Sequence, residues 1–69
     1  IPMRELEEVE LLPDELEALK LYYVDEMDQT KAARKMKISQ PTFARILARA
    51  NAKVSDAIIN AKAISIMKK

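Results

Sequence analysis

The chain has 69 residues, a formal net charge of +1, and no glycine, cysteine or histidine. Without cysteine and histidine it forms no disulfide bonds and none of the usual zinc sites. A chain this short buries only about 60% of its unfolded surface, so close helix packing or dimerisation must supply its stability.

Residues 1–12 form an N-terminal extension whose structure the pattern leaves open. Leu6 and Val9 have helical spacing, whereas Val9 and Leu11 alternate with glutamates as in a half-buried strand. Residues 13–24 are the first predicted helix, because Pro13 suits the first helical position and acidic residues follow it near the positive end of the helix dipole. We expect the buried stripe of this helix to consist of Leu12, Leu16, Leu19 and Tyr23.

Residues 28–36 are predicted to form a second, short helix. Asp28 suits the N-cap position, because its carboxylate can accept hydrogen bonds from the first N–H groups. The spacing of Ala32, Ala33 and Met36 places them on one inner face. Lys37 then takes the turn position, where we expect a left-handed conformation that glycine usually supplies.

Residues 39–62 are predicted to form a long third helix with its extension. Either Ser39 or Gln40 caps it, since the residue before Pro41 avoids the α region. A spacing of three and four residues predicts its buried face, which comprises Phe43, Ile46, Leu47, Ala50, Val54, Ala57, Ile58 and Ala61. The segment that follows is either a fraying helix end or a strand that pairs with residues 8–11 of the same or a second chain.

The composition and this order of elements predict an all-α, three-helix helix-turn-helix domain with a long third helix, to which a minor two-stranded pairing of the termini can be added. In such a motif the first residues of the last helix enter the major groove of DNA. Glutamine can pair with adenine and arginine with guanine. The candidates for base contacts are Gln40, Thr42 and Arg45, and those for phosphate contacts are Lys31, Lys35, Ser39, Arg49 and Lys53.

The charge is distributed very unevenly along the chain. Residues 1–26 carry two basic and nine acidic groups, whereas residues 27–69 carry ten basic and two acidic ones. No acidic residue lies between Gln29 and Ser55. This asymmetry favours a surface for a polyanion. The alternative is attraction between an acidic and a basic face within the chain, with Ser39 as an ordinary helix cap and the cations as a solvated surface.

Three stretches carry a resemblance to a known family, namely DELEALKL, AARKMKISQPTFARIL and KVSDAIINAKAI. Over residues 1 to about 66 the chain resembles a prokaryotic family of small, uncharacterised predicted DNA-binding proteins. That family is similar to region four of sigma-70-type factors, which reads a promoter element. The resemblance implies a three-helix domain in which Ser39, Gln40, Thr42 and Arg45 match the exposed start of the reading helix. The family typically has glycine where this chain has Lys37, and often where it has Ala61.

These observations together predict a sequence-specific binder of double-stranded DNA that regulates transcription, in the cytoplasm. No enzyme activity and no cofactor are expected, because no glycine-rich phosphate loop is present and the carboxylates have helix-surface spacing with nothing to desolvate them. No apolar run approaches the roughly 20 residues of a membrane span, and no signal peptide is visible. Since the sequence begins at Ile1, we expect it to be a fragment of a longer protein.

A protein-interaction module is the alternative function. The acidic residues at positions 5–17 could contact a basic partner, and a sigma-like domain could contact RNA polymerase or a regulator. A homodimer could form through apolar residues near the C-terminus, namely Ile59, Ile64, Ile66 and Met67. Replacement of Gln40 and Arg45 distinguishes the alternatives, because it should disable a DNA reader and leave a pure interaction module intact.

Overall fold

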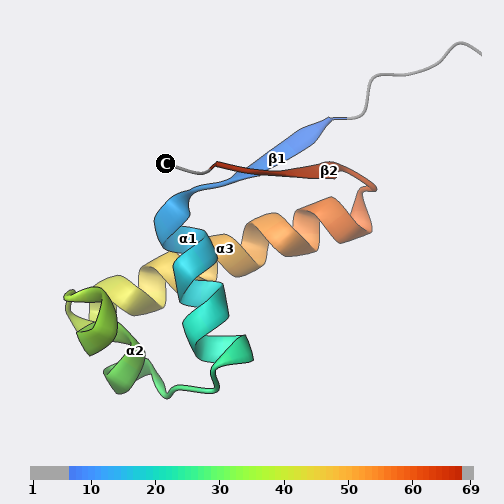
Figure 1. Cartoon of the computed structure of the whole chain (residues 1–69). Coiled ribbons are helices and arrows are strands. Elements are labelled where there is room, and N and C mark those ends of the chain that lie inside the picture. Colours follow the sequence, from blue (N-terminus) through green and yellow to red (C-terminus); the bar gives the residue numbers. More distant parts are fainter. Residues whose placement is uncertain (1–6, 68–69) are drawn as a thin grey trace, which may run out of the picture.

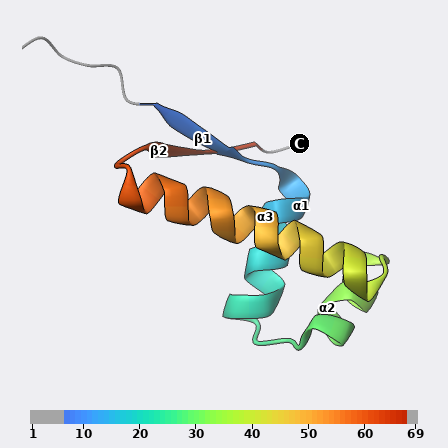
Figure 2. The same cartoon turned by 180° about the vertical axis from the view of Figure 1, so that it is seen from behind.

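The structure is a computed structural model, and it describes residues 7–67. The elements in chain order are β1 (Glu8–Leu11), α1 (Pro13–Leu19), the π-helical turn η1 (Lys20–Val24), α2 (Gln29–Met36), α3 (Gln40–Ile59) and β2 (Ala63–Ile66). The sheet runs along the C-terminal half of α3, and α2 packs near the start of that helix (Figures 1 and 2). Within residues 7–67, no helix combines the length and apolarity needed to cross a membrane.

The first and last described elements pair with each other as a parallel sheet. Val9 lies opposite Ile64, and Leu11 lies opposite Ile66. The Ala63 N–H donates to the Glu7 carbonyl at 2.9 Å, and the Met67 N–H donates to the Leu11 carbonyl at 3.0 Å. The strand alternative for both segments is therefore confirmed, and the pairing occurs within one chain. The strands are parallel because the helices between them form the crossover connection that parallel pairing requires.

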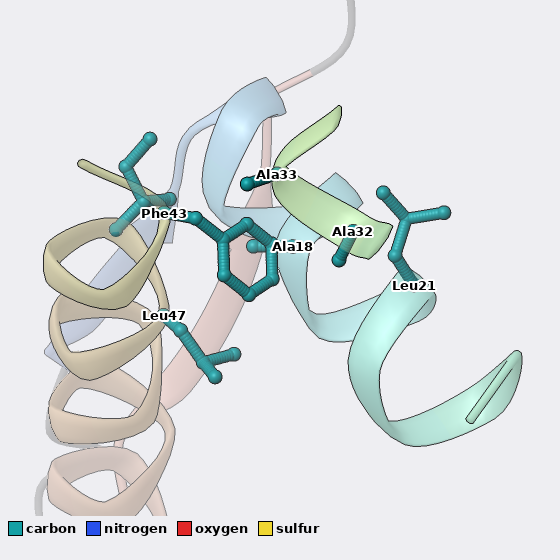
Figure 3. Close-up of a cluster of buried hydrophobic side chains, with 7 residues drawn as sticks. Ala18, Leu21, Ala32, Ala33, Phe43 and Leu47 are labelled. Carbon is teal, nitrogen blue, oxygen red and sulfur yellow. The ribbon is translucent and has the colours of Figure 1, made fainter. Parts of the chain in front are cut away.

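The hydrophobic core lies where the three helices meet (Figure 3). The Phe43 ring of α3 is fully buried, and Figure 3 shows it lying among Ala18 of α1, Ala33 of α2 and Leu47 of α3. The alanines allow the helices to approach closely enough to surround this one large ring. Replacing Phe43 with alanine in such a site typically costs about 3–5 kcal/mol.

Most of the predicted inner face of the helices is confirmed. Ala32 and Ala33 of α2 are buried, and Met36 is half-buried against the same cluster. On α3 the buried residues include Phe43, Ile46, Leu47, Ala50 and Ala57.

The predicted buried stripe of the first helix is wrong for most of its residues, although Leu19 packs against the core cluster. Leu12 and Tyr23 are exposed, at 36% and 54% of their surface, and Leu16 and Leu19 are only half-buried. The buried residues of α1 and η1 are instead Glu15, Ala18 and Leu21. The hydropathy pattern failed here because a charged side chain occupies a core position, where cations of α3 bind it.

Helix α3 is shorter than the prediction of residues 39–62. It begins at Gln40 and ends at Ile59, and the exposed Ile58 and Ala61 lie outside the core. Ala61 has a φ of 54°, which reverses the chain toward β2. The Lys62 N–H donates to the Ala57 carbonyl at 2.8 Å, which completes a helix-ending motif of the Schellman type.

A left-handed residue follows each of η1, α2 and α3. Glu26, Lys37 and Ala61 have φ values of 56°, 62° and 54°. At Lys37 the Ile38 N–H bonds to the Ala33 carbonyl at 3.0 Å, which again is a Schellman pattern. The expected left-handed conformation of Lys37 is confirmed. It is adopted without glycine, at a cost of about 1 kcal/mol per position.

Candidate nucleic-acid interface

The start of α3 is fixed by Ser39. Its Oγ accepts a hydrogen bond from the Thr42 N–H at 3.3 Å and donates one to Thr42 Oγ1 at 2.9 Å. Ser39 has extended backbone angles and Gln40 is the first helical residue, so Ser39 is the cap and the alternative of Gln40 is wrong. Pro41 disfavours helical backbone angles at Gln40, but this is only a preference. The hydrogen bonds of the Ser39 side chain outweigh it here. The hydroxyls of Ser39 and Thr42 therefore both take part in capping.

Gln40 lies on the exposed side of this helix start and is bound to α2. Thr30 Oγ1 donates to Gln40 Oε1 at 3.2 Å, which orients the amide. Its amide N–H groups make no hydrogen bond within residues 7–67 and can donate to a ligand. Gln40 and Arg45 are both exposed, as the sequence predicts, and Thr42 is half-buried.

One row of exposed residues follows the first half of α3 at helical spacing. It consists of Pro41, Arg45, Ala48 and Ala52, and Arg45 is its one charged residue. The major groove of B-DNA is about 12 Å wide and admits a helix.

A group of cations lies on α2, the turn after it and the start of α3, and we call it the basic surface. It comprises the exposed residues Lys31, Arg34, Lys35, Lys37 and Arg45. Among residues 7–67, no ion pair neutralises any of them. Two of these cations, Arg34 and Lys37, were not among the predicted contacts. Their position in the segment without acidic residues was the signal that could have identified them.

Arg49 and Lys53, two of the predicted phosphate contacts, lie in a different environment. Arg49 Nε binds Glu15 Oε2 at 3.0 Å, and Lys53 Nζ binds Glu15 Oε1 at 2.8 Å. Lys53 Nζ also donates to the Glu10 carbonyl at 2.8 Å, and Arg49 Nη2 lies 3.8 Å from Asp14 Oδ2. The structure thus does not group these two cations with the basic surface. They join α3 to α1 and β1.

Glu15 is the centre of this network. Its side chain is fully buried, and its Oε1 also accepts a hydrogen bond from the Leu12 N–H at 2.9 Å. Burial by itself raises the pKa of Glu15, but the hydrogen bonds from Leu12, Lys53 and Arg49 outweigh it and hold the pKa below its ordinary value. The expectation that nothing desolvates a carboxylate is wrong for this residue. A charged, fully bonded carboxylate is a structural tie between helices.

The described residues define a class of protein, namely a small three-helix domain, mostly helical, with a two-stranded parallel sheet. The chain belongs to the family described as "Protein of unknown function DUF134", and the match covers residues 1–69. The predicted membership in a family of uncharacterised prokaryotic proteins is thereby confirmed.

Named relatives come from several organisms. The chain is 48% identical over 66 residues to a UPF0251 protein of Moorella thermoacetica, which covers 96% of this chain and 44% of that protein. It is 50% identical over 66 residues to a UPF0251 protein of Pelotomaculum thermopropionicum, which covers 96% of this chain and 50% of the relative. A UPF0251 protein of Methanosarcina mazei is 48% identical over 60 residues, and this match covers 87% of this chain and 37% of the relative.

The chain spans about half the length of the curated relatives it matches, or somewhat less. No solved structure matches it. The names of these relatives state no activity, so the functional argument rests on the geometry of this domain.

Proposed function

We propose that this chain is a DNA-binding domain of the helix-turn-helix type that acts in transcription regulation. In this proposal α2, the turn at Lys37 and α3 form the motif, and the start of α3 enters the major groove. One observation carries the proposal: the exposed row of α3 that starts at Pro41 begins within a basic surface that no carboxylate neutralises among residues 7–67. The resemblance to region four of sigma factors agrees with this assignment.

The proposed contacts divide into two kinds. Gln40 and Arg45 are exposed at the helix start and are the base-contact residues, with Thr42 between them. Lys31, Lys35, Arg34 and Lys37 extend from α2 and the turn and contact phosphates, which gives affinity without sequence information. Ser39 contributes as the cap that fixes the helix start. Arg49 and Lys53 are omitted from the contacts because Glu15 already binds them.

Fluorescence anisotropy on labelled duplex DNA tests the proposal. The purified chain is titrated onto a mixed-sequence duplex at several salt concentrations. We expect binding whose logarithm falls steeply with the logarithm of salt concentration, because five cations release counterions from DNA. A single small module has few contacts, so the affinity should be modest.

The variant Gln40→Ala/Arg45→Ala should weaken binding to a selected operator by about tenfold or more. Lys20→Ala is the matched control for lost charge, because Lys20 lies on η1 and pairs with Asp25 at 2.8 Å. It should leave the affinity unchanged. Absence of binding at low salt, or equal losses in both variants, would overturn the proposal in favour of a protein-interaction module.

A further inference from the structure

Strand β2 is an edge strand with one open side. Peptide groups alternate in direction along a strand. The N–H groups of Ala63 and Met67 point to β1, where they bond to Glu7 and Leu11. The N–H and C=O groups of Ile64 and Ile66 therefore point away from β1, and among residues 7–67 no further strand lies beside them.

The other edge of the sheet is protected. Glu8 and Glu10 place negative charge along β1, and the outward carbonyl of Glu10 accepts a hydrogen bond from Lys53 Nζ at 2.8 Å. Charged residues and covered backbone groups are the usual means of blocking strand addition. In contrast, β2 has the sequence AISI, without a charge, and its isoleucines at 64 and 66 are 44% and 47% exposed.

We propose that the open edge of β2 binds β2 of a second copy of this chain in antiparallel orientation, about a two-fold axis at Ser65. Ile64 of each copy then lies opposite Ile66 of the other. Each such pair exchanges two backbone hydrogen bonds, because the outward groups of both residues face each other. The four isoleucine side chains lie on one face of the resulting sheet, where cross-strand apolar pairs add stability.

The charge distribution selects a second copy as the occupant and limits the assembly to a dimer. The partner strand must itself be uncharged and open, and β2 meets both conditions. In the four-stranded order β1-β2-β2-β1, the acidic strands form both outer edges and block further addition.

The position of the sheet is compatible with this dimer. The sheet lies along the C-terminal half of α3, and the basic surface lies around the start of that helix and α2 (Figure 1). Two copies joined at β2 thus do not need to bring their basic surfaces together. The dimer does not depend on the DNA-binding proposal, and it can be tested without DNA.

Sedimentation equilibrium of the 69-residue chain tests the inference. The mass should rise with concentration from that of one chain, 7.9 kDa, to twice that value. Ile64→Pro removes one outward N–H and leaves the bonds to β1 intact, so it should raise the dissociation constant about tenfold or more. Glu8→Pro is the matched control on the β1 edge and should leave the dimer unchanged. A monomer at every concentration, or a dimer that Ile64→Pro does not weaken, would overturn the inference.

A thiol at the proposed axis provides a second test that does not disturb the backbone. The chain has no cysteine, and Ser65 would face its own copy in a pair without hydrogen bonds, whose Cα atoms lie about 4.5 Å apart. That spacing suits a disulfide. Ser65→Cys should form a covalent dimer under mild oxidation much faster than Ser55→Cys, a control on the exposed surface of α3. Equal rates would exclude this register even if Ile64→Pro fails to fold.

Discussion

Arg45 and Arg49 lie one turn apart on α3, and the structure places them in opposite circumstances. Arg45 is exposed and has no carboxylate partner among residues 7–67, whereas Arg49 binds the buried Glu15 at 3.0 Å. The difference comes from α1, which crosses α3 near its middle and brings Glu15 there (Figure 1). Both residues are arginines of the same helix, so neither the residue type nor the helical period distinguishes them. The element that crosses α3 at each arginine decides whether it forms an ion pair.

The largest expected effect concerns the ion pairs of Arg49 and Lys53 with Glu15 and their contribution to stability. Arg49→Ala combined with Lys53→Ala leaves Glu15 buried with the Leu12 N–H as its one remaining hydrogen-bond donor among those described. We expect the free energy of unfolding to fall by about 3 kcal/mol in urea denaturation at neutral pH. The matched double variant Lys31→Ala/Lys35→Ala should cost about 1 kcal/mol at most, because both residues are exposed and carry no ion pair there. Equal losses of unfolding free energy in the two double variants would contradict the distinction between the cations that pair with Glu15 and those of the basic surface.

The next effect is a change in the pH dependence of stability. Glu15→Gln should cost about 1–3 kcal/mol at neutral pH, because hydrogen bonds to a charged group are lost. Folding lowers the pKa of Glu15 from an ordinary value of 4.5, so the carboxylate stabilises the fold above that value and loses its contribution as the pH falls through the lower, folded pKa. The unfolding free energies of the wild type and Glu15→Gln should converge as the medium becomes acidic. A constant difference down to strongly acidic pH would contradict this role.

A smaller effect separates the basic surface from Arg49 in DNA binding. Lys35→Ala should reduce the log–log salt slope of binding by about 1, since one phosphate contact that displaces counterions is lost. Arg49→Ala should leave the slope unchanged, because Glu15 and Asp14 already pair with that guanidinium. The comparison uses protein whose circular dichroism shows the native helix content. A reduced slope for Arg49→Ala would return this residue to the set of phosphate contacts.

The smallest effect concerns the left-handed residues that precede and follow α3. Lys37→Gly and Ala61→Gly should each stabilise the chain by about 0.5–1 kcal/mol, because glycine adopts a positive φ without steric cost. Ala48→Gly, on the exposed middle of α3, is the control and should destabilise by about 1 kcal/mol. Chemical denaturation of the three variants measures the changes. Destabilisation by all three would show that these positions do not carry the expected strain.

The sequence predicted the elements well where local rules decide them. Pro13, Asp28 and Lys37 marked the helix limits correctly, because first-turn proline, N-cap and left-handed turn are properties of a few neighbouring residues. The exposed positions of Gln40 and Arg45 followed from the helical period in the same way. The short alternating segments near both ends left a strand as one of two alternatives, and their parallel direction required knowledge of what lies between them.

The sequence failed where partners distant along the chain decide the outcome. Glu15 occupies a core position because cations 34 and 38 residues further along bind it, and a hydropathy pattern treats any glutamate as exposed. The same contacts remove Arg49 and Lys53 from the predicted phosphate set. Ile58 fits the apolar period of α3 but is 72% exposed, because the core cluster between the helices does not extend past Leu47 of α3.

The pairing of β1 with β2 also has a consequence for the time course of folding. It joins the first described element to the last one, so it closes the longest loop in the domain and contributes contacts of the highest sequence separation. During synthesis β1 has no partner until β2 has left the ribosome, whereas the helices can already surround Phe43. We therefore expect the sheet to form after the helical core, and loss of residues 63–66 would leave β1 without its partner strand.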